Sequence, residues 1–230
     1  RFMIDLSGKK RWRPNARAAK SRAYVNSLPD RTPWTRPPAQ GRTRRRAGTR
    51  GAAYNPPPMD LARFMRLVPR GDLWVFGYGS LMWAPHFPYE ERAIGRLWGL
   101  HRSLCIRSSR YRGTPQKPGL VLGLCAGGSC WGIAFRVAAR RVPGVLKVLW
   151  DREMPRRVYR PGFVRVRLPR RRAVSALTFI ADPMHRGFAG ALDLRSRARL
   201  VAQGIGERGR CTDYVRNTLE HMATLGVGDP

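Results

Sequence analysis

The feature that most limits how this chain can fold is a change in composition near residue 58. Residues 1–58 show no sustained apolar periodicity, whereas apolar residues recur regularly from residue 60 onward. The first segment is also rich in proline, at Pro14, Pro29, Pro33, Pro37, Pro38 and Pro56 to Pro58. Such a segment cannot bury enough surface to offset the entropy lost on ordering. We therefore expect a folded domain over 59–230, preceded by a disordered basic extension over 1–58.

The charge of the chain is extreme, with 45 Lys and Arg against 14 Asp and Glu, a net of +31. Such a balance favours anionic partners. The excess is uneven, because residues 1–70 carry 18 basic and 3 acidic side chains. Runs of charge are usually solvated, however, so the charge alone identifies no partner.

Two interpretations of residues 1–58 remain open. In the first, the segment is a disordered extension, or an upstream stretch that precedes a true start at Met59. In the second, it is an arm that binds nucleic acid, with Trp12, Tyr24 and Trp34 interleaved among arginines. No zinc-finger, helix-turn-helix or RNP pattern accompanies the arm, so the first interpretation is favoured.

The apolar runs and the cysteines argue against a membrane-bound or disulfide-bonded protein. No apolar run approaches the roughly 20 residues needed to cross a bilayer. The N-terminus also lacks the apolar region of a secretory signal. Four cysteines without a CxxC pair indicate neither a disulfide scaffold nor a metal cluster. We expect a cytoplasmic protein with no membrane partner and no metal or other cofactor.

The pattern from residue 73 onward predicts strands first and helices later, which indicates an α+β domain. Strands are expected at 73–76, 94–106, 119–125, 130–137, 164–168 and 174–180. A hairpin is expected across the glycine-rich residues 126–129. A helix is expected to begin at Pro143 and to end near residue 154.

Two further helices are expected near the C-terminus. The first contains Leu194, Ala198 and Val201 at helical spacing. The second is expected to be capped by Thr212 and ended by Gly226. Its predicted apolar face consists of Val215, Leu219, Met222 and Leu225.

The most informative stretch for chemistry is the one in which the first strand runs into two glycines. It reads Phe76-Gly77-Tyr78-Gly79-Ser80-Leu81-Met82-Trp83. Glycine lets the backbone turn sharply and brings successive N–H groups close to a bound anion. On its own the pattern is weak, because a glycine-rich turn after a strand is more often structural.

A second stretch, Trp150-Asp151-Arg152-Glu153-Met154, lies at the end of the predicted helix. Glu153 is either half of a surface ion pair, which would contribute little to stability, or a general base. Spacing alone favours the ion pair.

Together the two stretches resemble the ChaC-type γ-glutamylcyclotransferases, which are specific for glutathione. The resemblance covers roughly residues 71–230 and no part of 1–58. Further motifs follow in the same order, at Tyr111-Arg112-Gly113-Thr114-Pro115, 118–124, 127–130, 132–136, Ala181-Asp182-Pro183 and Cys211-Thr212-Asp213-Tyr214. Several independent motifs in one order make this a specific signal.

The resemblance implies a small mixed β-barrel with flanking helices. It also implies a lyase that cleaves glutathione into 5-oxoproline and Cys-Gly without a cofactor. Glu153 matches the catalytic glutamate of the family, and because arginines surround it we expect a lowered pKa. The residues expected to hold the substrate are Phe76, Gly77, Tyr78, Gly79, Ser80, Leu81, Arg112, Tyr159 and Tyr214.

Two other motifs do not support a function. Gly204-Ile205-Gly206-Glu207-Arg208-Gly209 matches the dinucleotide-binding fingerprint letter by letter. A helical pattern precedes it, however, and the remaining chain is too short for a βαβ unit, so we expect a loop between helices. Ser80 and Ser129 lack the G-x-S-x-G context of a serine hydrolase.

Overall fold

The computed structural model describes residues 3–4, 10–11, 59–170 and 172–229. The chain separates into two compact units, Arg1–Tyr54 and Asn55–Pro230. The described residues of the first unit form two short antiparallel strands, β1 (Met3–Ile4) and β2 (Lys10–Arg11). The predicted disorder of the remaining extension lies outside the described residues.

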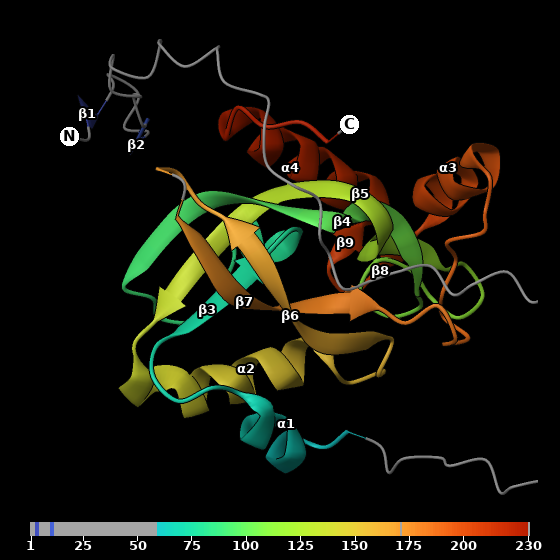
Figure 1. Ribbon diagram of the computed structural model, residues 1–230. Coiled ribbons are helices and arrows are strands. Elements are labelled where there is room, and N and C mark those ends of the chain that lie inside the picture. Colours follow the sequence, from blue (N-terminus) through green and yellow to red (C-terminus); the bar gives the residue numbers. More distant parts are fainter. Residues whose placement is uncertain (1–2, 5–9, 12–58, 171, 230) are drawn as a thin grey trace, which may run out of the picture. The chain divides into compact units, whose positions relative to one another are not determined.

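The second unit is built on a closed five-stranded barrel with the strand order β3-β5-β4-β6-β7 (Figure 1). Neighbouring strands run antiparallel, except that β7 runs parallel to β3 and, at one residue pair, to β5. The predicted mixed barrel in an α+β domain is therefore confirmed. The strands are β3 (Leu73–Gly77), β4 (Glu91–Ser108), β5 (Gly119–Val137), β6 (Tyr159–Arg167) and β7 (Ala173–Ala181).

The interior of the barrel follows from the alternation of side chains along its strands. In β6, Val166 is fully buried while its neighbours Arg165 and Arg167 are exposed, as the two-residue period of a strand requires. Inward-facing residues of all five strands form one cluster, which includes Phe76, Leu97, Leu124, Val166 and Ala176. Fully burying such a side chain contributes roughly 1.5–3 kcal/mol, so this cluster holds the barrel closed.

The hairpin predicted across 126–129 is wrong. Both flanking segments belong to the single strand β5, which pairs with β4 on each side of the glycines. Trp98 lies opposite Ser129 and Leu100 opposite Ala126, so Gly127 and Gly128 together face one residue of β4. Both glycines have positive φ values. They therefore form a β-bulge that bends the long strand instead of reversing it.

Four α-helices and several shorter elements complete the described part of this unit. In Figure 1, α2 lies below the barrel and α4 above it. The helices are α1 (Leu61–Leu67), α2 (Val142–Glu153), α3 (Leu194–Gln203) and α4 (Cys211–Thr224). The shorter elements are the 3₁₀ turns η1 (Ser80–Met82) and η2 (Ala139–Arg141) and the strands β8 (Ile205–Gly206) and β9 (Gly209–Arg210).

Helix α2 forms as predicted and places Glu153 at its last position. Pro143 lies in the first turn, where its missing N–H is not needed. Val145, Leu146 and Leu149 are buried in the apolar cluster shared with α1 and β3. The helix ends there because Pro155 follows the C-cap residue and cannot continue the hydrogen-bond ladder.

Two details of the α4 prediction are wrong. The helix begins at Cys211 with Arg210 as its N-cap, so Thr212 lies inside the first turn. Leu219 is 60% exposed. The buried face consists of Cys211, Tyr214, Thr218 and Met222. Cys211, Tyr214 and Thr218 can be buried because their polar atoms hydrogen-bond to backbone groups. The buried face therefore differs from the face predicted from the apolar residues of the sequence. Gly226 follows the helix with positive φ, as expected.

Candidate active site

A cavity of about 1010 Å³ brings most of the predicted site residues together. Its size lies at the upper end of the range for small-molecule sites, roughly 300–1,000 Å³. The predicted residues that line it are Tyr78, Gly79, Ser80, Leu81, Arg112, Glu153, Tyr159 and Tyr214. Phe76 and Gly77 do not line it.

Phe76 and Gly77 do not line the cavity but influence the turn that does. The Phe76 side chain is fully buried in the barrel, and its carbonyl accepts a hydrogen bond from Thr178 Oγ1 at 3.0 Å. A Cβ atom at Gly77 would lie 2.7 Å from the Cβ atom of Leu81. Only glycine therefore allows the chain to turn back so closely that Gly79 to Leu81 reach the cavity.

The turn after β3 lines the cavity with Gly79, Ser80 and Leu81. Ser80 to Met82 form the single turn η1, and the first N–H groups of a helical turn have no partner inside it. Space at Gly79 is limited, because a Cβ atom there would lie 3.3 Å from the Tyr214 hydroxyl. A side chain at this position would therefore crowd the Tyr214 hydroxyl, which lines the same cavity.

Glu153 is the single carboxylate among the described residues that line the cavity. Its side chain is only 18% exposed. Burial raises its pKa above the usual value, while Arg152 and, less strongly, Arg208 lower it. The expected net lowering is therefore wrong, because loss of hydration at the helix end outweighs the attraction of the nearby cations.

Arg152 connects Glu153 to the turn after β3 through an ion pair and a hydrogen bond. Its Nε atom lies 3.0 Å from Glu153 Oε1, and its Nη2 atom donates to Ser80 Oγ at 2.8 Å. Its Nη1 atom donates to the Ala84 carbonyl at 2.5 Å. The Arg152 side chain is 13% exposed. The ion pair is thus largely buried, unlike the surface pair that spacing alone favoured.

Three tyrosines form a neutral wall of the cavity. Tyr159 donates its hydroxyl to the Leu122 carbonyl at 2.8 Å, and the Leu122 N–H donates to the Tyr214 hydroxyl at 3.3 Å. Tyr78 donates to the Phe179 carbonyl at 2.7 Å. Burial raises the pKa of all three phenols. They therefore stay protonated and serve as hydrogen-bonding groups.

Arg112 links two segments of the rim. Its Nη1 atom donates to the carbonyls of Arg208 and Arg210 at 2.5 and 3.2 Å. Its guanidinium lies 5.3 Å from the centre of the Tyr214 ring. The segment that it anchors is the small β8–β9 hairpin between α3 and α4. The fingerprint-like glycines are therefore part of a connection between helices, as expected.

Sequence reasoning did not identify Arg152 and Arg208 as site residues. Both line the cavity. The one signal for Arg152 was its position beside Glu153. Arg208 had no local signal, because only the fold brings the β8–β9 hairpin to the cavity.

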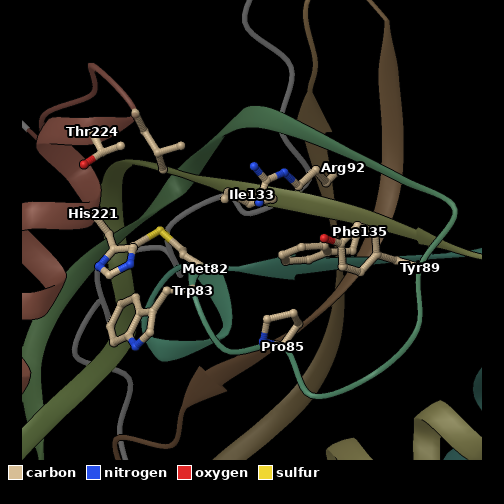
Figure 2. Close-up of a pocket in the computed structure, with 10 residues that line it drawn as sticks. Met82, Trp83, Pro85, Tyr89, Arg92, Ile133, Phe135, His221 and Thr224 are labelled. Atoms are coloured by element: carbon tan, nitrogen blue, oxygen red, sulfur yellow. The ribbon is translucent and has the colours of Figure 1, made fainter. Parts of the chain in front are cut away.

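A smaller cavity of about 260 Å³ lies beside η1 (Figure 2). The rings of Trp83 and His221 stack there with centroids 4.7 Å apart. The other lining residues include Tyr89, Arg92, Phe135 and Thr224. None of the predicted site residues and no carboxylate line it among the described residues. The larger cavity is therefore the candidate active site.

Two features are absent from the described residues. No group of three or more His, Cys, Asp or Glu side chains is arranged to hold a metal ion. No helix in that part of the chain is both long and apolar enough to span a membrane.

Comparison with known proteins identifies the family. The family described as "ChaC-like protein" matches residues 73–230. The chain belongs to the ChaC-like family. This match spans the whole barrel, from the first residue of β3, and includes both the turn after β3 and Glu153.

Named relatives of this ChaC-like chain are similar over most of their length. A glutathione-specific γ-glutamylcyclotransferase of Escherichia coli strain K12 is 36% identical over 159 residues, which is 69% of each chain. The human glutathione-specific γ-glutamylcyclotransferase 1 is 30% identical over 186 residues, covering 76% of this chain and 83% of its own.

A solved structure confirms the fold. The crystal structure of a γ-glutamyl cyclotransferase specific to glutathione from yeast superposes with a TM-score of 0.64 at 20% identity. The superposition covers 69% of this ChaC-like chain and 90% of the yeast chain. The barrel with its flanking helices is thus the γ-glutamyl cyclotransferase fold.

Proposed function

We propose that this chain is a glutathione-specific γ-glutamylcyclotransferase, a lyase that cleaves glutathione into 5-oxoproline and Cys-Gly. The observation that carries the proposal is Glu153, a largely buried carboxylate whose raised pKa suits a general base. It lies in a ChaC-like chain, bound through Arg152 to the turn after β3. The names of the bacterial and human relatives support the same substrate.

The reaction needs no second reactant. The α-amino nitrogen of the γ-glutamyl group attacks the γ-carbonyl carbon of the same molecule and closes a five-membered ring. The bond to the cysteine nitrogen then breaks, and no water is consumed. Because nucleophile and electrophile belong to one molecule, the site contributes mainly by holding the reactive conformer.

Glu153 moves the proton in this scheme. It takes a proton from the substrate's α-ammonium group, which makes the nitrogen nucleophilic, and returns it to the departing amine of Cys-Gly. Proton transfer in both directions requires a carboxylate whose pKa is closer to neutrality than that of an exposed glutamate. The burial of Glu153 supplies this property.

The turn after β3 holds the γ-glutamyl group. The N–H groups of Ser80 and Leu81 stabilise the negative charge that develops on the γ-carbonyl oxygen. Tyr78, Tyr159 and Tyr214 form the neutral wall against which the substrate chain lies. Phe76 and Gly77 fix the position of this turn, and Arg112 holds the β8–β9 hairpin at the rim of the cavity.

The catalytic domain in this proposal is 59–230, and the extension 1–58 is not needed for activity. A protein that begins at Met59 should keep the melting temperature and glutathione turnover of the full chain; unfolding or loss of catalysis would contradict this division. We place the enzyme in the cytoplasm, because all four cysteines are free, as is usual in a reducing compartment.

The test of the activity is product analysis. The purified full chain is incubated with glutathione, and 5-oxoproline, Cys-Gly and free glutamate are separated and quantified. We expect equal amounts of 5-oxoproline and Cys-Gly, and unchanged turnover after exhaustive chelation. Free glutamate as the main product, or activity that chelation abolishes and zinc restores, would contradict the proposal.

A further inference from the structure

The lining of the candidate active site is strongly asymmetric in charge. Five exposed arginines line it, at Arg107, Arg110, Arg156, Arg186 and Arg208. The carboxylate that lines the same cavity, Glu153, is largely buried and already paired with Arg152. The exposed rim is therefore cationic, and an anionic part of a bound molecule would be attracted to it.

The backbone of Arg208 is held in place at the rim of the cavity. Its backbone N–H donates to the Tyr111 carbonyl at 3.0 Å, and its own carbonyl accepts from Arg112 at 2.5 Å. The hairpin approaches the rim so closely that a Cβ atom at Gly206 would lie 2.3 Å from the Arg110 carbonyl. The backbone of Arg208 is thus fixed from both sides.

The Arg208 side chain is oriented but unpaired. Its guanidinium lies 4.3 Å from the centre of the Tyr111 ring, and such stacking leaves the N–H groups at the edge of the guanidinium free. Glu207, the neighbouring acid, is held by Arg110 Nε at 2.9 Å from both carboxylate oxygens. Within the described residues, no carboxylate or carbonyl forms a hydrogen bond or ion pair with the Arg208 guanidinium, although its charge lowers the pKa of Glu153.

We propose that Arg208 is a specificity-determining residue that binds the terminal carboxylate of the peptide that leaves in the reaction. This inference rests on the proposed cleavage of glutathione. Glu153 must face the α-amino group, so the α-carboxylate beside it lies at the buried end of the cavity. The second carboxylate of glutathione, on its glycine, is at the opposite end of the molecule and therefore at the rim.

The chemistry of a guanidinium–carboxylate pair explains why an arginine suits this role. A guanidinium can donate two parallel hydrogen bonds to one carboxylate, which gives both affinity and geometric specificity. The contact lies far from the bond that breaks, so it is the same in the bound substrate and in the transition state. Such uniform binding lowers KM and leaves kcat unchanged. Because Arg208 also lowers the pKa of Glu153, the enzymes are compared at a pH above the acidic limb of their activity profiles, where Glu153 is deprotonated in both.

The test crosses two enzymes with two substrates. Wild type and Arg208→Met are assayed with glutathione and with glutathione whose glycine carboxylate is an amide. We expect Arg208→Met to raise the KM for glutathione about tenfold, the usual effect of losing a charged hydrogen bond. The amide should show a raised KM with wild type and no further rise with the variant. Arg208→Lys should lie between the two enzymes.

Arg165→Met provides the matched control, because Arg165 is an exposed arginine of β6 that does not line the cavity. It should leave both KM values unchanged. Turnover of the amide by Arg208→Met shows that the variant is folded. An equal rise of KM for both substrates, an unchanged KM for glutathione, or a fall in kcat for both would overturn the role of Arg208. If wild type turned over neither peptide, the proposed function itself would fail.

Discussion

The two ends of the candidate active site differ in how their polar groups are held. At the buried end, Glu153 and three tyrosines are all engaged by protein partners. At the rim, five exposed arginines line the opening, and Arg208 has a fixed backbone but a free guanidinium. In the proposed mechanism, burial determines reactivity at one end, and charge attracts the substrate at the other.

This difference shows why a net charge of +31 and a raised pKa of a carboxylate can coexist. Charges at an exposed rim are hydrated and screened. The loss of hydration at Glu153 exceeds the combined effect of Arg152 and Arg208 on its pKa. Burial therefore has the largest influence on the pKa of Glu153, and the neighbouring arginines moderate the shift.

The largest effect is expected from removing the base at the buried end. Glu153→Gln keeps the shape of the side chain and should lower kcat on the order of 10²–10⁴-fold, the usual loss for a general base. Circular dichroism and a steady-state assay measure fold and turnover. Asp151→Asn, an exposed neighbour on the same helix, should change neither. More than about half of the wild-type activity in Glu153→Gln would contradict the mechanism.

A smaller effect is expected from removing the cation next to the base. Arg152 lowers the pKa of Glu153, so Arg152→Met should raise that pKa further. The base must be deprotonated to act, and the acidic limb of the profile of kcat/KM against pH should therefore move to higher pH. Loss of the bond to Ser80 should also lower kcat/KM about ten- to hundredfold near neutrality.

The control for this charge effect is Arg152→Lys, which keeps the cation. Its acidic limb should stay closer to that of wild type. If both variants kept the wild-type pH profile, Glu153 would not be the group that titrates in this limb.

The smallest effect is expected at the tyrosine wall, where the change concerns stability. Tyr214→Phe leaves the buried N–H of Leu122 without its partner, which typically costs about 1–3 kcal/mol. We expect a melting temperature lower by roughly 3–10 °C, measured by calorimetry. Tyr89→Phe, on a half-exposed ring, should stay within about 0.5 kcal/mol of wild type. Equal melting temperatures of wild type, Tyr214→Phe and Tyr89→Phe would show that the Tyr214 hydroxyl does not stabilise the wall.

Local signals were sufficient where a short segment determines its own structure. The turn after β3 was predicted because Gly77 and Gly79 lie directly after an apolar strand. The end of α2 at Glu153 was predicted because Pro143 and the apolar spacing define that helix. These two segments supply Glu153 and the glycine-rich turn to the buried end of the cavity, so these lining residues were predicted from sequence.

Long-range contacts were decisive where prediction was wrong. Gly127 and Gly128 resemble a hairpin turn locally, and only their pairing with β4 makes them a bulge. The sign of the pKa shift of Glu153 depended on burial, which the string of nearby arginines did not reveal. Arg208 reaches the cavity only because the β8–β9 hairpin binds to segment 110–112.

The most direct test of the central claim uses water labelled with oxygen-18. Glutathione is turned over by the purified chain in this water, and the 5-oxoproline is analysed at once by mass spectrometry. Attack by the substrate's own amino group predicts unlabelled 5-oxoproline, released in equal amount with Cys-Gly. Free glutamate carrying one oxygen-18 atom would show that water is the nucleophile and would contradict intramolecular cyclisation.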